Sequence, residues 1–277
     1  MTARAPAPEA ERLRLGASSW SAPSWEGVFY PAGMDPGDYL AHYATRFDTV
    51  EIDATFYRSP TEKMVDGWRR KTPDGFLFAA KVPQVITHDK MLEGCGEELG
   101  TFLKVIGRLG DRLGPLLFQF RYFKKGEFPD PKPFIDRLER FLPALPREMR
   151  FAVEVRNKSF VVPRLLDVLR AHRVALAFID HPWFHRIDQM IARPETLTAD
   201  FGYLRWLGDR YAIETKTTTW DRLIVDRRRE MAACMPSVRA LLERTRSTVG
   251  YFNNHYAGYA VGSILLFREL WEDQAAG

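Results

Sequence analysis

The sequence predicts a single (β/α)8 barrel domain, the TIM-barrel fold of the α/β class. Eight short strand-like segments alternate with helical segments along the 277 residues, and such alternation is typical of a parallel sheet. Eight βα units in roughly 260 residues fit the size of this barrel. A doubly wound open sheet is the alternative, but that fold usually carries a glycine-rich phosphate loop after an early strand. The sequence has neither a G-x-G-x-x-G motif nor a P-loop, so we favour the barrel.

The composition is that of a globular protein. Hydrophobic residues make up 45% and charged residues 27% of the chain, which supplies enough core for one domain at 13–273. Residues 1–12 are rich in proline and alanine, and we expect a disordered tail. No apolar stretch approaches the roughly 20 residues that span a bilayer, and the N-terminus lacks a secretory signal. We therefore expect a cytoplasmic protein with no membrane partner, in which Cys95 and Cys234 form no disulfide.

The strands are apolar or alternating runs that stop at polar or turn residues. The first reads LRLGASSW, and the second begins with the β-branched pair Val50 and Ile52 and ends at Phe56 and Tyr57. The third ends on Lys81, and the fourth, PLLFQF, has one polar residue. The expected segments are 13–20, 49–58, 76–83, 115–120, 150–156, 174–180, 201–208 and 248–256.

The helices show apolar residues at helical spacing and residues that favour helix ends. Thr61 is expected to cap a helix at 63–70, and prolines begin those at 131–142 and 163–171. The stretch 181–200 fits only a short helix, so the sixth helical unit is expected to be short or irregular. The other expected helices begin at Asp35 or Pro36 or span 97–109, 219–246 (interrupted near Pro236) and 260–271.

Polar side chains fall at the ends of seven of the eight strands. A barrel brings the carboxyl ends of its strands to one face, where function concentrates in barrel enzymes. An unpaired buried charge is costly, so inward-facing charges must be solvated, protonated or paired. These strand-end residues are Glu51, Asp53, Thr55, Lys81, Gln119, Glu154, Arg156, Asp180, Arg205, Asn253, Asn254 and His255. Their regular placement predicts a functional site at this face.

The mixture of charges suits acid–base chemistry on an anionic substrate, a small molecule or a polymer, that carries phosphate, carboxylate or sugar. Glu51 and Glu154 are the predicted acid/base pair, with Asp180 as a third catalytic carboxylate, and hydrolysis is the favoured reaction. The expected anion-binding residues are Lys81, Arg156 and Arg205. The other expected substrate contacts are Trp20, Tyr57, His88, Gln119, Asn253, Asn254 and His255. Trp183 and the aromatic loop from Trp20 through Trp25 to Tyr30 are expected to cover the substrate.

Structural interpretations stay open for the same residues. Glu51 and Asp53 would then pair with Lys81, and Arg205 would be the partner of a carboxylate. A single divalent metal held by Glu154, Asp180 and His255 is also open, although neighbouring cations compete with a metal. No organic cofactor is expected.

Two other functions fit parts of the sequence. The net charge of +4 and three basic runs suggest a nucleic-acid-binding or processing module, although such runs are usually solvated helix faces. The runs are Arg69-Arg70-Lys71, Lys124-Lys125 and Arg227-Arg228-Arg229. A barrel retained as an interaction scaffold is the third possibility, and it predicts mutually paired strand-end charges with no ligand-sized cavity.

The chain resembles the DUF72 family, which includes the bacterial YecE-like proteins. The resemblance rests on several motifs in order, from W-x-G-x-F-Y-P at Trp25 to EVRNKSF at Glu154. The other matching stretches are VEIDATFYRSP, FLFAAKVPQVITH, LLFQF and YFNNHYAGYA. Asp53 stands where the family usually has asparagine, and Arg121-Tyr122, 157–160 and 206–208 also depart from its pattern. The resemblance implies a TIM barrel and shared chemistry at Glu51 rather than Asp53, but it implies no reaction.

Overall fold

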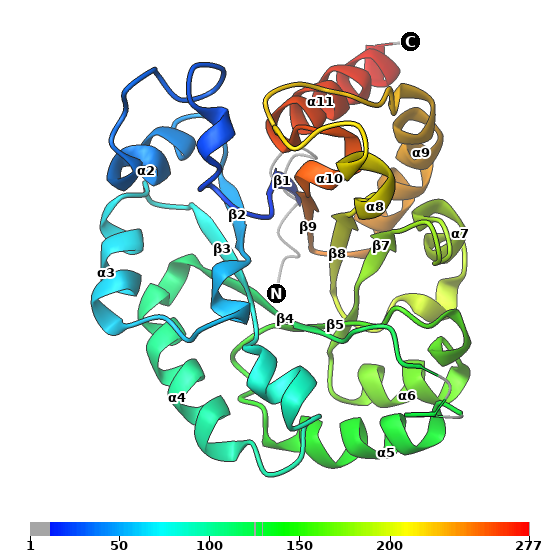
Figure 1. Cartoon of the computed structure of the whole chain (residues 1–277). Coiled ribbons are helices and arrows are strands. Elements are labelled where there is room, and N and C mark those ends of the chain that lie inside the picture. Colours follow the sequence, from blue (N-terminus) through cyan, green and yellow to red (C-terminus); the bar gives the residue numbers. More distant parts are fainter. Residues whose placement is uncertain (1–11, 125, 129, 277) are drawn as a thin grey trace, which may run out of the picture.

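A computed structural model describes residues 12–124, 126–128 and 130–276. The predicted tail lies almost wholly outside these residues. Parallel strands form the centre of the molecule and helices surround them (Figure 1). The strands are β1 Leu13–Ala17, β2 Thr49–Ile52, β3 Leu77–Lys81, β4 Leu113–Gln119, β5 Phe151–Glu154, β6 Ala175–Leu176, β7 Phe178–Asp180, β8 Phe201–Trp206 and β9 Ser247–Phe252.

The helices follow the strands around the outside of the barrel. Thr61 caps α3 as predicted, since its side chain accepts a hydrogen bond from the Met64 amide at 3.3 Å. Pro163 begins α6, where its missing N–H is not needed. The helices are α2 Tyr39–Tyr43, α3 Glu62–Arg70, α4 Gly96–Ile106, α5 Lys132–Phe141, α6 Pro163–Ala171, α7 Ile187–Ile191, α8 Arg210–Glu214, α9 Arg228–Arg244, α10 Asn254–Ala257 and α11 Ala260–Ala276. None of the described helices is long and apolar enough to cross a membrane.

The strands form two hydrogen-bonded sheets, in the orders β1-β9-β8-β7 and β2-β3-β4-β5-β6. β1 and β2 are neighbours but lie in different sheets, and the side chain of Tyr43 bridges them in place of backbone hydrogen bonds. Its hydroxyl accepts from the Ala17 amide at 2.8 Å and donates to the Thr49 carbonyl at 3.1 Å. The two strands still approach closely, because a Cβ at Gly16 would lie 2.1 Å from the Thr49 oxygen. The two sheets also separate between β6 and β7, at Ala177, which lies within the predicted sixth strand.

Two predicted segments need correction. The long helix begins at Arg228 rather than at 219, and it continues through Pro236. The segment 219–227 contacts α10 instead. The amides of Ile224 and Val225 donate to the Ala257 carbonyl at 2.7 and 3.1 Å. The helix α8 was not predicted. Its cap is the Asp209 side chain, which accepts from the Ala212 amide at 3.0 Å.

Two predicted strands are also shorter than expected. The second, predicted at 49–58, ends at Ile52, and a single helical turn at Ala54–Phe56 follows it. The last was predicted at 248–256. It ends at Phe252, and Asn253 then caps the short helix α10. The polar run after β9 therefore leaves the barrel wall. The short sixth helical unit is present as α7.

Candidate active site

Three buried charges form the centre of the site. Glu51 on β2 and Glu154 on β5 are fully buried, and Arg205 on β8 is 1% exposed. Arg205 Nη2 donates to Glu51 Oε1 at 2.7 Å, and its Nη1 donates to Glu154 Oε2 at 2.5 Å. Tyr203, two residues before Arg205 on the same face of β8, donates its hydroxyl to Glu51 Oε2 at 2.6 Å. One arginine therefore crosses the barrel and joins carboxylates from two other strands.

Glu154 and Arg205 are charged at neutral pH. Burial acts to raise the pKa of Glu154, but the positive charges of Arg205, Arg156 and Lys81 outweigh it and bring the pKa down to about 2. Burial acts to lower the pKa of Arg205, and the two carboxylates more than offset this effect and raise it. Buried ions of this kind persist only when each has a partner.

Arg156 connects the buried charges to the mouth of the barrel. It follows β5, and its Nε donates to Glu154 Oε1 at 3.0 Å while its side chain is 28% exposed. No other acceptor within the described part of the chain is bonded to its guanidinium. Glu154 thus holds one edge of Arg156 and leaves the other nitrogens available to a ligand.

Lys81 and Asp53 form a second ion pair at the same face. Lys81 is 8% exposed, and its ammonium lies 5.5 Å from the centre of the Phe56 ring. The turn that carries Asp53 is fixed by Thr55, whose hydroxyl donates to the Ile52 and Lys81 carbonyls at 2.8 and 2.7 Å. The sequence left open whether Lys81 pairs with Glu51 or with Asp53. Lys81 pairs with Asp53, and Glu51 pairs with Arg205.

Two histidines lie near these cations. Burial lowers the pKa of His88 to about 4, and the charges of Arg121 and Arg156 add to this effect. Burial likewise lowers the pKa of His181, followed by the charge of Arg156. Both imidazoles are therefore neutral at pH 7. His88 Nδ1 is hydrogen-bonded to the Thr87 hydroxyl at 2.9 Å.

His181 was missed by the sequence reasoning. Its signal was the same as that of the predicted residues, a polar side chain directly after a strand. Its Nδ1 accepts from the Trp183 amide at 3.3 Å, so the proton of the neutral ring is on Nε2.

Asp180 does not join this cluster. In the register of β7 and β8, Ile179 is paired with Arg205 and Asp180 with Trp206. Paired residues of parallel strands point to the same side, so Asp180 faces the helices and Ile179 faces the barrel interior. Burial raises the pKa of Asp180 there, although the positive charge of Arg227 acts to lower it.

The remaining predicted residues occupy different places. Gln119 is 7% exposed and is in register with Glu154. Trp20 packs edge-on against Trp68 and Phe78 among the helices rather than over the mouth. Tyr57 is 69% exposed.

The polar run after β9 forms its own cluster. His255 Nδ1 is 2.6 Å from Asn253 Oδ1, and its Nε2 is 3.2 Å from Glu214 Oε1. Asn254 accepts from the Ala260 amide at 2.9 Å. The metal-binding set of Glu154, Asp180 and His255 is therefore not assembled, and no group of three or more possible ligands exists among the described residues.

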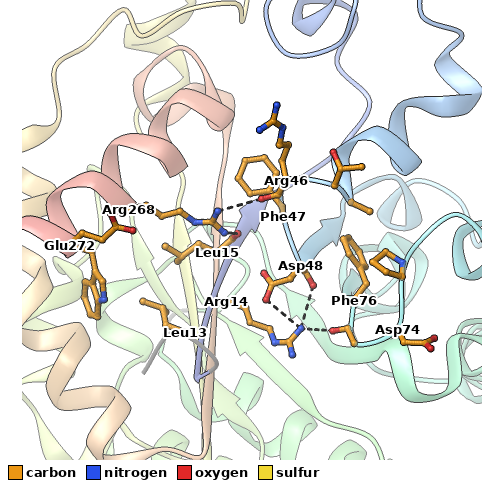
Figure 2. Close-up of a pocket in the computed structure, with 15 residues that line it drawn as sticks. Leu13, Arg14, Leu15, Arg46, Phe47, Asp48, Asp74, Phe76, Arg268 and Glu272 are labelled. Carbon is orange, nitrogen blue, oxygen red and sulfur yellow. Dashed lines mark hydrogen bonds and ion pairs between the residues drawn. The ribbon is translucent and has the colours of Figure 1, made fainter. Parts of the chain in front are cut away.

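Cavities lie at both ends of the barrel. At the mouth, a cavity of about 480 Å³ is lined by Tyr122, Trp183 and the loop 157–159. A smaller one of about 160 Å³ adjoins Asp53 and His255. A third, of about 910 Å³, is a groove at the opposite end, beside the starts of β1 to β3 (Figure 2). Active sites of TIM barrels lie at the carboxyl ends of the strands, so we place the candidate site at the mouth.

Sequence comparison identifies the family. Residues 14–277 match the family described as "Protein of unknown function DUF72". The chain belongs to the DUF72 family. It is 32% identical over 149 residues to the UPF0759 protein YecE of Escherichia coli K12, a match that covers 53% of this chain and 50% of YecE. The chain thus spans about half the length of this curated relative.

Solved structures of DUF72 proteins share the fold. The protein from Thermotoga maritima is 28% identical, covers 94% of this chain and 99% of its own, and has a TM-score of 0.75. A DUF72 protein from Enterococcus faecalis is 21% identical, covers 94% and 95%, and has a TM-score of 0.73. A fusion protein with a xylose isomerase-like TIM barrel matches at a TM-score of 0.54 and 13% identity, covering 96% of this chain and 44% of its own. The predicted barrel is confirmed.

Proposed function

We propose that this DUF72 protein is an enzyme that binds a phosphate- or carboxylate-bearing substrate at the mouth of the barrel and acts on it by acid–base chemistry. The proposal depends on one observation, the way in which Glu154 holds the partly exposed side chain of Arg156. A fully buried carboxylate fixes one edge of its guanidinium, and 28% of its side chain is exposed after the carboxyl end of β5. Arginine binds phosphate and carboxylate through two parallel hydrogen bonds, and a fixed guanidinium loses little entropy in doing so.

The two neutral histidines are the acid–base groups of this proposal. A neutral imidazole accepts a proton at its unprotonated nitrogen and donates a hydrogen bond from its N–H. His88 takes the proton of the attacking water and, once protonated, passes it to the leaving oxygen, while His181 donates a hydrogen bond from Nε2 to the bound anion. Hydrolysis of a phosphoester or glycosidic bond is the reaction class that this pair serves.

In this proposal Glu51 and Glu154 position Arg205 and Arg156. Neither carboxylate is exposed, and the low pKa of Glu154 leaves it without a proton to donate. A catalytic role for the two glutamates stays a prediction, as does a role for Asp180.

Calorimetric titration with inorganic phosphate tests the binding step. Arg156→Gln is expected to weaken phosphate binding at least about tenfold, because hydrogen bonds to charged groups are worth about 1.5–3 kcal/mol. Arg121→Gln is the matched control, since Arg121 lies at the same face but is paired with Glu127. Equal affinities in wild type and Arg156→Gln would remove the proposal.

Binding of single-stranded nucleic acid is a second candidate, favoured by exposed aromatic rings on the segments that follow the strands. Tyr57, Tyr122, Trp183 and Tyr211 are 69%, 54%, 58% and 72% exposed, and the Trp183 and Tyr211 rings stack at 6.5 Å. Bases stack on such rings.

The basic runs add little to this candidate. Arg69 pairs with Asp111, Arg227 with Glu230 and Arg228 with Glu269, and Lys125 lies outside the described residues. Fluorescence anisotropy with an oligothymidine tests this function. Affinity that falls steeply with salt and drops in Trp183→Ala is the expected result, and an absence of binding at low salt contradicts it.

A further inference from the structure

A second cavity at the mouth contains two buried polar groups without protein partners. Ser18 is 5% and Trp25 is 1% exposed. Neither the Ser18 hydroxyl nor the Trp25 indole N–H has a hydrogen-bond partner among the described residues. Both residues line the cavity of about 160 Å³ next to Asp53. Because a buried donor without a partner has lost the hydrogen bonds that water would make to it, something in this cavity is expected to satisfy both.

The loops around the cavity are held in place before any ligand arrives. The Trp25 carbonyl accepts from the Phe29 and Tyr30 amides at 2.8 and 3.0 Å. The neighbouring Ser24 hydroxyl accepts from the Trp220 amide at 3.2 Å, which ties the loop after β1 to the loop after α8. Trp25 is therefore a rigid donor rather than a mobile cover.

The lining combines donors, acceptors and aromatic surface. Trp25 offers a donor, Ser18 a hydroxyl, and Asp53 a carboxylate, while Trp220 offers ring surface. An anion is disfavoured beside Asp53, and an apolar group would leave the two donors unpaired. A sugar hydroxyl donates and accepts at once, and the carbon face of a sugar packs on aromatic rings, so a sugar satisfies every group.

The volume limits the size of the occupant. At about 30 Å³ of liquid volume per water, the cavity holds roughly five waters, which suits one sugar ring rather than an oligosaccharide. We propose that this cavity is a subsite for a single neutral sugar ring, bound by Trp25, Ser18 and Asp53. It rests on the proposed function in one respect: Lys81, the partner of Asp53, acts together with Arg156 on Glu154, so the sugar would lie on the side of Lys81 that is near the anion proposed at Arg156. The substrate class is then a sugar phosphate or nucleotide.

Nuclear magnetic resonance of the full chain, labelled with ¹⁵N, tests the subsite directly. The probe is neutral methyl β-D-ribofuranoside, and the signal is the indole Nε1–H peak of Trp25, assigned from the spectrum of Trp25→Phe. We expect this peak to shift saturably, while the peak of Trp271 in the groove at the other end stays fixed. Ser18→Ala is expected to weaken sugar binding about fivefold, the effect of one hydrogen bond, and it keeps the test valid if Trp25→Phe does not fold.

A separate titration with inorganic phosphate distinguishes this proposal from the proposed function. Arg156→Gln is expected to abolish the phosphate response and to leave the shift caused by the sugar. A sugar shift without phosphate binding would support the subsite and remove the anion site. A Trp25 peak that no sugar concentration moves, or an affinity unchanged by Ser18→Ala, would mean that water fills the cavity and would overturn the subsite.

Discussion

The two ends of this barrel use charged residues in different ways. At the carboxyl ends of the strands, Arg205 joins Glu51 and Glu154 with at most 1% of any of these side chains exposed. At the opposite end, the groove of Figure 2 holds Arg14 and Asp48, 29% and 50% exposed and 3.5 Å apart. The groove is larger than either cavity at the mouth, yet this ion pair is partly exposed to solvent. The burial of the charged groups, rather than the size of the cavity, shows at which end the charges are held in a fixed geometry.

Removing Arg205 is expected to have the largest effect on stability. Arg205→Met leaves two carboxylates buried without a partner and should lower the free energy of unfolding by about 3–5 kcal/mol. Urea denaturation measures it. The triple variant Glu51→Leu, Arg205→Met, Glu154→Leu should recover most of this loss, because it removes the charges together. A loss below about 1 kcal/mol in Arg205→Met would contradict the buried network.

The second-largest effect is expected from acid, which should destabilise the buried network of Glu51, Glu154 and Arg205. The folded pKa of Glu154 is about 2, below its ordinary value of 4.5. Its stabilising contribution, about 3 kcal/mol, is therefore complete above about pH 4.5 and is lost as the pH falls toward 2. Urea denaturation across this range should show a steeper fall for wild type than for Glu154→Gln. Parallel curves would mean that Glu154 is not held as a buried ion.

Tyr203→Phe tests one hydrogen bond of the network. It removes the donor to Glu51 Oε2, and we expect a loss of about 1.5–3 kcal/mol because the acceptor is charged. The matched control is Tyr251→Phe, whose hydroxyl lies 2.9 Å from the neutral Thr49 hydroxyl and should cost about 1 kcal/mol. Equal losses in the two variants would argue that Glu51 carries no charge.

The smallest effect is expected in the groove. Arg14→Gln removes an exposed ion pair and should change the free energy of unfolding by less than about 1 kcal/mol. A loss comparable to that of Arg205→Met, measured by the same denaturation, would erase the difference between the two ends.

The order of strand-like and helical segments predicted the fold, and alternation within the strands predicted the inner residues. Alternation along strands with mixed polar and apolar residues shows which side chains share a face, and it placed Glu51, Glu154 and Arg205 on the interior. The run VALAFID is apolar up to Asp180, so it carries no alternation, and the register that turns this residue outward was not readable.

The sequence also did not show which charged side chains pair with each other. Whether Lys81 meets Glu51 or Asp53 depends on distances across strands, which spacing along the chain does not give. The unpaired state of Trp25 and Ser18 is likewise a property of the folded loops alone.

The most direct test of the account is a crystal structure determined with phosphate. We expect a phosphate ion on the exposed edge of the Arg156 guanidinium, at the mouth between His88 and His181, with Glu154 still bound to the opposite edge of Arg156. Phosphate found only in the groove near Arg14, Arg46 and Arg268, with none on Arg156 at saturating concentration, would contradict the assignment of the site to the carboxyl ends of the strands.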